Sequence, residues 1–185
     1  MEKDREKCEL ILKEFTKSES LLKHAYAVES CVKEYAKKFN ADENFWGNVA
    51  LLHDFDYEKF PSLEYHPFEG AKILKEKGFS EEFITAILSH ADHTNVPRVT
   101  QLQKVLYACD ELSGFITAVT LVRPNKSLDE VEVKSVKKKM KDKAFSKAVS
   151  REDIINGAEN LGIPLDEHIQ FCINAMRRNK GLLGL

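Results

Sequence analysis

Apolar residues recur along the chain every three or four positions, which is the spacing of amphipathic α-helices. The spacing predicts a first helix over residues 2–15 and a second over residues 18–39, with Ser18 or Ser20 as its N-terminal cap. A third helix begins near residue 42 and ends at the dipeptide His53-Asp54. A half-buried sheet would require segments in which apolar and polar residues alternate over the length of a strand, and the chain has no such segment. The pattern therefore predicts an all-α fold.

The middle of the chain continues in the same way after a loop-like segment over residues 55–65. His66-Pro67 is typical of a helix start, because proline is preorganised for the first helical position, and Gly78 is typical of a helix end. A further helix, capped by Ser80, extends to His90. We expect these two helices to be short.

A long apolar helix follows, reaching residue 122, and Thr100 with Gln103 forms a capping-box pattern at its start. Ser127 with Glu130 has the same pattern. The C-terminal third predicts shorter amphipathic helices over residues 130–139, 144–149, 151–160 and 165–178. Since no internal repeat or linker divides residues 1–185, we expect one domain.

The composition is that of a soluble domain able to bury a core. Of 185 residues, 43% are hydrophobic and 31% are charged, which excludes disordered, collagen-like and coiled-coil classes. The 30 acidic and 28 basic residues leave a net charge of −2, so we expect no nucleic-acid partner and no anionic membrane. Seven lysines between residues 134 and 147 favour a solvated helix face.

Cysteine usage and the N-terminus predict a cytoplasmic protein. The four cysteines are scattered and form no CxxC pair, a pattern that fits neither a disulfide scaffold nor a structural zinc site. The opening MEKDREKCEL is charged where a signal peptide is apolar, and no apolar run approaches the roughly 20 residues of a membrane span.

The histidines indicate where the chemistry lies. Five of the six fall between residues 24 and 93, each near a predicted helix end or one turn inside a helix. Asp110 stands in the middle of the long apolar helix, where an unpaired carboxylate is costly to bury. A divalent metal shared with neutral imidazoles would pair it, and His24, His53 and Asp54 supply a mixed nitrogen and oxygen set that suits zinc, iron, manganese or nickel. Taken alone, any one of these histidines is more typical of a hydrogen-bonded structural residue.

In this order on consecutive helices, His24, His53-Asp54 and Asp110 resemble the H…HD…D signature of the HD superfamily of metal-dependent phosphohydrolases. His66 in HPFEGAKILKEKGF is similar to the HxxxGA.IL segment of HDIG-type and HD-GYP-type members, and His90 lies in ILSHADH. The segment YACDELSGFITAVTLVRP is similar to a small, functionally undefined subfamily of predicted HD-superfamily hydrolases. The resemblance covers about residues 20–125. It implies an HD-domain helical bundle with additional C-terminal helices over residues 126–185.

The resemblance also implies a metal centre and a reaction. One or two divalent ions (iron, manganese, nickel, zinc or magnesium) are expected as cofactors. One ion would lie on His24, His53, Asp54 and Asp110, and a second on His66 and His90, with Asp54 bridging. The implied reaction is hydrolysis of a phosphate ester of a small metabolite or nucleotide by metal-activated water, with His53 and Asp54 at its centre.

The chain departs from its relatives close to the signature. HDIG-type enzymes carry a lysine three residues after the aspartate, and the mononuclear 5′-nucleotidase branch carries a glutamate there, but this chain has Tyr57. The phosphate-binding cation must therefore come from elsewhere, and Lys59, Arg98 and Arg123 are the candidates. No GYP-like motif is present, which argues against cyclic dinucleotide hydrolysis.

Two other functions fit the same ligands. HD-fold proteins resembling inositol oxygenase use a di-iron centre to activate dioxygen, and a metal-stabilised module could bind a nucleotide or a protein without turnover. Further residues could either line the pocket or only pack, namely Tyr107, Ser113, Gly114 and Thr117. His93 could be an additional donor or a surface residue. The oligomeric state stays open.

Overall fold

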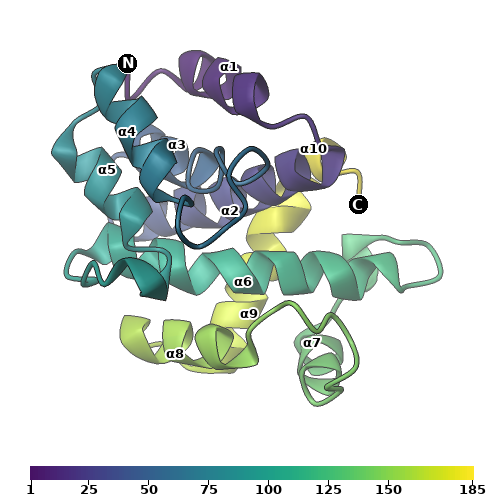
Figure 1. Cartoon of the computed structure of the whole chain (residues 1–185). Helices are drawn as coiled ribbons and strands as arrows, with labels where there is room; N and C mark the ends of the chain where they lie inside the picture. The colour runs from purple at the N-terminus through teal and green to yellow at the C-terminus, as the bar shows by residue number, and fades with distance from the viewer.

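Two long helices, α2 (Glu19–Lys38) and α6 (Gln101–Leu121), pack against each other and form the centre of the fold (Figure 1). The computed structural model describes all 185 residues, 65% of them helical and none in a strand, which confirms the predicted all-α class. The other helices are α1 (Arg5–Phe15), α3 (Glu43–Leu51), α4 (Phe68–Glu76), α5 (Glu81–Leu88), α7 (Val133–Met140), α8 (Arg151–Leu161), α9 (Leu165–Arg178) and α10 (Lys180–Leu183). Two 3₁₀ turns, η1 (Asp92–Thr94) and η2 (Leu128–Glu130), join them.

Two of the predicted caps, Ser80 and Thr100, are confirmed, whereas Ser18 precedes α2 without a side-chain hydrogen bond to its first turn. The side chains of Asp42, Ser80 and Thr100 each accept hydrogen bonds from backbone amides in the first turn of α3, α5 and α6, and the capping box of Thr100 and Gln103 is complete. Helix α1 begins at Arg5 because Asp4 caps it. These caps satisfy amides that have no partner inside the helix, so they set where each helix begins.

The segment between α6 and α8 differs from the predictions. Ser127 caps the short turn η2, and the capping box instead joins Glu132 and Ser135 at the start of α7. The predicted helix over residues 144–149 is wrong, because these residues form turns whose carbonyls accept hydrogen bonds from the Arg151 guanidinium. A helix of so few residues makes too few internal bonds to repay the ordering of its backbone.

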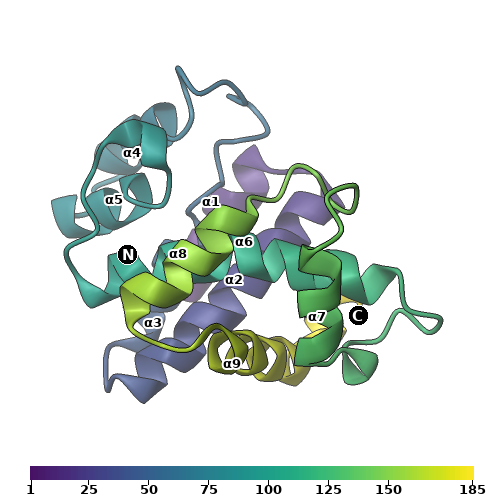
Figure 2. The same ribbon diagram turned by 90° about the horizontal axis from the view of Figure 1, so that it is seen from below.

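The C-terminal helices share the core of the rest of the chain. One cluster of buried apolar side chains extends from Cys8 in α1 to Leu183 in α10. Helices α7 and α8 lie on the side of α6 opposite α4 and α5, and α9 contacts both α2 and α6 (Figures 1 and 2). None of the helices is both long and apolar enough to cross a bilayer.

The contact between α6 and α8 depends on a glycine. A Cβ placed on Gly157 would stand 2.7 Å from the Cα and 3.0 Å from the Cβ of Ala108, closer than real Cβ atoms approach backbone. We expect Gly157→Ala to lower the free energy of unfolding by about 1–2 kcal/mol, because overpacking outweighs the better helix propensity of alanine. Urea denaturation measures the change.

The matched control is Gly181→Ala, where a Cβ would meet no atom within 4 Å. It should leave the urea midpoint unchanged or raise it slightly. Equal stability of the two variants would show that α8 does not depend on this close approach.

Candidate metal centre

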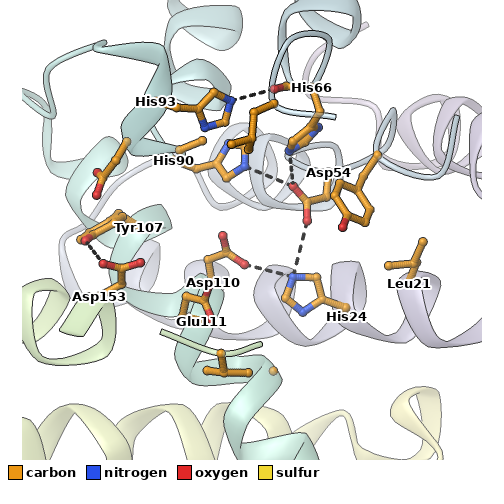
Figure 3. A pocket seen from close by; sticks show the side chains of 16 residues that line it. Leu21, His24, Asp54, His66, His90, His93, Tyr107, Asp110, Glu111 and Asp153 are labelled. Carbon is orange, nitrogen blue, oxygen red and sulfur yellow. Dashed lines mark hydrogen bonds and ion pairs between the residues drawn. The ribbon is translucent and has the colours of Figure 1, made fainter. Parts of the chain in front are cut away.

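The six predicted ligands come together around one cavity of about 620 Å³, and Figure 3 shows the five that line it. Five of them line the cavity, and His53 lies fully buried behind them. His24 and Asp110 project from inside α2 and α6, whereas the other ligands lie at or near helix ends. These are His53 and Asp54 after α3, His66 before α4, and His90 after α5.

A first group of donor atoms forms where α2, α6 and the end of α3 meet. Asp110 Oδ1 lies 3.0 Å from His24 Nε2 and 3.3 Å from His53 Nε2. Asp54 Oδ2 lies 3.5 Å from His53 Nε2 and 3.9 Å from His24 Nε2. Ligand atoms of His24, His53 and Asp54 all fall within 4.8 Å of one another, which is close enough to hold a single ion.

A second group lies on the other side of Asp54. Its Oδ1 is 3.2 Å from His66 Nε2 and 3.1 Å from His90 Nε2, and these three residues also present ligand atoms within 4.8 Å of one another. The two oxygens of Asp54 therefore face different groups (Figure 3). This is the arrangement that a bridging carboxylate requires.

Hydrogen bonds on the far side of three rings determine which nitrogen faces the cavity. Nδ1 of His53 lies 2.7 Å from the Ala50 carbonyl, and Nδ1 of His90 lies 2.6 Å from the Ile87 carbonyl. Nδ1 of His66 lies 2.8 Å from Asp56 Oδ1. A carbonyl or carboxylate oxygen can only accept, so each Nδ1 donates and each neutral ring directs the lone pair of Nε2 inward.

Two buried atoms of the centre have no hydrogen-bond partner, His53 Nε2 and Asp54 Oδ1. Both have neighbours at ion-pair distance, but their geometry suits no hydrogen bond. Leaving such atoms unsatisfied is costly. His53 Nε2 belongs to the first group of donor atoms and Asp54 Oδ1 to the second, so a cation held by each group would satisfy one of them. The imidazole and carboxylate set therefore fits a divalent transition metal.

Ionisation in the cluster shows the same need for positive charge. Burial disfavours the charged form of His53, but the charges of Asp54 and Asp110 outweigh it and raise the pKa of His53 to about 10. The same balance at His66, with Asp54 and Asp56 as the carboxylates, raises its pKa to about 9. Burial opposes the charged form of Asp54 and Asp110, yet the neighbouring imidazoles hold the pKa of both carboxyl groups well below the usual range. Protons thus compensate the carboxylates, and a dication would displace them.

Asp56 has a role that the sequence did not reveal. Its side chain is fully buried, with Oδ1 on His66 Nδ1 and Oδ2 accepting from the Gly70 amide at 2.8 Å. A Cβ on Gly70 would lie 2.8 Å from the Asp56 carboxylate, which explains the glycine of the HPFEGA segment. The pairing of the aspartate two residues after His53-Asp54 with this glycine is the signal that could have identified it.

The cavity has a second, acidic wall. Glu111 accepts a hydrogen bond from the Ser150 amide at 3.2 Å, and Asp153 of α8 accepts one from the Tyr107 hydroxyl at 3.0 Å. Burial and the nearby charge of Asp110 raise the pKa of Glu111 to about 7. Tyr107 was among the predicted pocket residues, whereas nothing in the sequence pattern indicated Glu111 or Asp153.

The structure places none of the three cations predicted to bind phosphate on the cavity lining. Arg98 lies 3.5 Å over the Tyr107 ring and donates to the carbonyls of Ser89 and His90. Lys59 lies 4.0 Å from the centre of the Phe15 ring, and Arg123 lines a different cavity beside α7. Position near the motif does not determine where a long side chain points, and phosphate binding by these three residues stays a prediction.

The smaller polar residues divide between lining and packing. Gly114 lines the cavity beside the His24 ring, and His93 lines it with Nε2 2.8 Å from the His66 carbonyl. The hydroxyls of Ser113 and Thr117 donate to α6 carbonyls instead. Tyr57 lines the cavity with its ring 5.3 Å from that of His66.

Asp56→Asn should weaken metal binding at the His66 side by about 10- to 100-fold, which is the usual loss when a residue that hydrogen-bonds to a metal ligand is changed. An amide can accept from only one of His66 and Gly70, so one of the two hydrogen bonds is lost. Competition with a coloured chelator measures the affinity. Asp166→Asn, an exposed change in the first turn of α9, is the control and should bind metal as the wild type does. Wild-type affinity in Asp56→Asn would contradict the role of Asp56.

Comparison with known proteins agrees with the geometry. The family model described as HD domain matches residues 21–114, just over half of the chain, and this range contains all six converging ligands. No solved structure matches the chain. The family match confirms the family that the ordered His, His-Asp and Asp motif indicated. The chain therefore belongs to the HD domain family.

Proposed function

We propose that the protein is a metal-dependent phosphohydrolase that cleaves a phosphate ester of a small metabolite or nucleotide. The observation that carries the proposal is the sharing of Asp54, whose two oxygens face two separate groups of inward-facing imidazoles. Paired metal sites of this kind suit phosphoryl transfer. HD domains are generally metal-dependent phosphohydrolases, which supports the same reaction.

The ligands would divide into two sets. His24, His53 and Asp110 would hold one ion, His66 and His90 would hold the other, and Asp54 would contact both. The ions would act as Lewis acids toward a phosphoryl oxygen and would lower the pKa of bound water toward neutrality. Imidazole-rich sets suit iron, manganese, nickel or zinc better than magnesium.

The protein itself orients these groups and shields them. The acceptors on Nδ1 of His53, His66 and His90 hold the rings with Nε2 facing the cavity. The apolar side chains of Leu21 and Val149 line the same cavity and would exclude water around a bound ester. The cavity volume of about 620 Å³ is in the range of small-molecule sites.

Metal content tests the two-site arrangement. Protein purified without an affinity tag and without oxygen should contain two metal equivalents per chain by elemental analysis. His66→Ala and His90→Ala should each remove one equivalent, because each deletes a donor of the second group alone. His93→Ala is the matched control: Nε2 of His93 contacts a backbone carbonyl, so two equivalents should remain. Unchanged content in the His66 and His90 variants would contradict a second site.

Activity tests the reaction. With manganese, nickel or cobalt, the protein should release phosphate from a small phosphate ester, and Asp54→Asn should lower kcat by more than about 100-fold, since the shared carboxylate contacts both groups. Asp166→Asn, on the surface, should retain full activity.

Other outcomes would replace the proposal. Full activity in Asp54→Asn would contradict the assigned centre. Iron-dependent consumption of dioxygen without phosphate release would favour the oxygenase function. Tight nucleotide binding without a product would favour a binding module.

A further inference from the structure

The cavity at the metal centre is acidic beyond its ligands. Its sixteen lining residues include five carboxylates and no lysine or arginine. Asp54 and Asp110 belong to the ligand groups, and Asp92 pairs with Arg98. Glu111 and Asp153 remain, and their side chains accept hydrogen bonds only from an amide and a hydroxyl, so neither forms an ion pair.

The arginine stacked on Tyr107 and the arginine two residues before Asp153 are both engaged elsewhere. The Arg98 guanidinium donates to backbone carbonyls at the end of α5 and covers the face of Tyr107. Arg151 donates to carbonyls in the turns before α8 and lies 4.6 Å over the Phe115 ring. Glu111 and Asp153 are therefore free to pair with a positive group of a ligand in the cavity.

The ligand-binding character of this cavity does not depend on the acidic wall. The unpartnered His53 Nε2 and Asp54 Oδ1 already mark the cavity as the place where a ligand binds. Figure 3 shows Glu111 and Asp153 on the side of Asp110 away from His66. The cavity thus has a metal-binding side and an acidic side.

The charges limit what the two sides can accept. Two divalent ions bring four positive charges, and Asp54 and Asp110 cancel two of them. The remainder is two positive charges, or one when buried Asp56 is counted, so a single phosphate dianion already balances it. A second phosphate group would be placed near Glu111 and Asp153, where like charges repel.

Resting on the phosphohydrolase function above, we propose that the substrate is a monophosphate ester of an amine-bearing alcohol. Its phosphate faces the two ligand groups, and its ammonium pairs with Glu111 and Asp153. Leu21 and Val149, on the same lining, contact the methylene groups between the two ends. The acidic wall selects this class over nucleoside di- and triphosphates.

The binding of two uncleavable, isosteric phosphonates tests the role of the ligand's ammonium charge without any catalysis. Calorimetry on the manganese-loaded protein compares 3-aminopropylphosphonate with butylphosphonate, which differ only in an ammonium for a methyl group. The amine should bind about tenfold more tightly, the effect of one charged hydrogen bond. Glu111→Gln and Asp153→Asn should each reduce this preference, and the double variant should abolish it. Both changes keep the oxygen that accepts from Ser150 or Tyr107.

The control is Glu152→Gln, one residue from Asp153 but exposed outside the cavity, which should keep the full preference. Equal binding of the two phosphonates to the wild type would overturn the proposal. An undiminished preference in the double variant would also overturn it.

Hydrolysis of a second pair of compounds tests the proposed substrate class separately from the proposed phosphohydrolase reaction. For 2-aminoethyl phosphate, kcat/KM should exceed that for propyl phosphate by about tenfold. Equal values would leave the phosphohydrolase function intact and overturn the substrate class. Absence of hydrolysis, with a phosphonate preference that still depends on Glu111, would overturn the reaction and support the amine site.

Discussion

The centre depends on hydrogen bonds that hold three imidazoles from behind. Two of these rings, His53 and His90, lie just after α3 and α5, where the last carbonyls of a helix have no amide partner within it. Each carbonyl accepts from Nδ1 and thereby presents Nε2 to the cavity. The helix end thus orients the ring, and the same carbonyl also accepts from the backbone amide of that histidine.

His66 presents the opposite problem, because it lies before α4, where the free backbone groups are amides. Amides cannot accept from Nδ1, so a carboxylate must stand between the ring and the helix. Asp56 does this, accepting from His66 with one oxygen and from the Gly70 amide with the other. A single buried side chain therefore caps α4 and orients a ligand, and the glycine leaves room for it.

Residue type and order in the sequence were sufficient to predict the all-α fold and to group His24, His53, Asp54 and Asp110, and the family resemblance added His66 and His90. The structure brings all six side chains to one cavity. Asp56 could not be found in this way, since its charge beside the motif resembles a surface position. The placement of the arginine side chains could not be predicted for a related reason. Arg98 lies close to the site in the chain, but its guanidinium is stacked on Tyr107. The turns over residues 144–149 depend on Arg151, a tertiary contact that periodicity does not record.

The family-matched part of the chain supplies the ligands, and the helices beyond it shape what surrounds them. Val149 and Asp153 come from outside residues 21–114, and α8 reaches the cavity because Gly157 lets it lie close to α6. Tyr57 stands where HDIG-type relatives carry a lysine, so it adds no charge to the lining. The six candidate ligands thus lie within the family-matched range, whereas Val149 and Asp153 of the cavity wall lie outside it. Because the wall carries carboxylates where a polyanion would need cations, electrostatics at this site favours a compact substrate with one phosphate and a positive group.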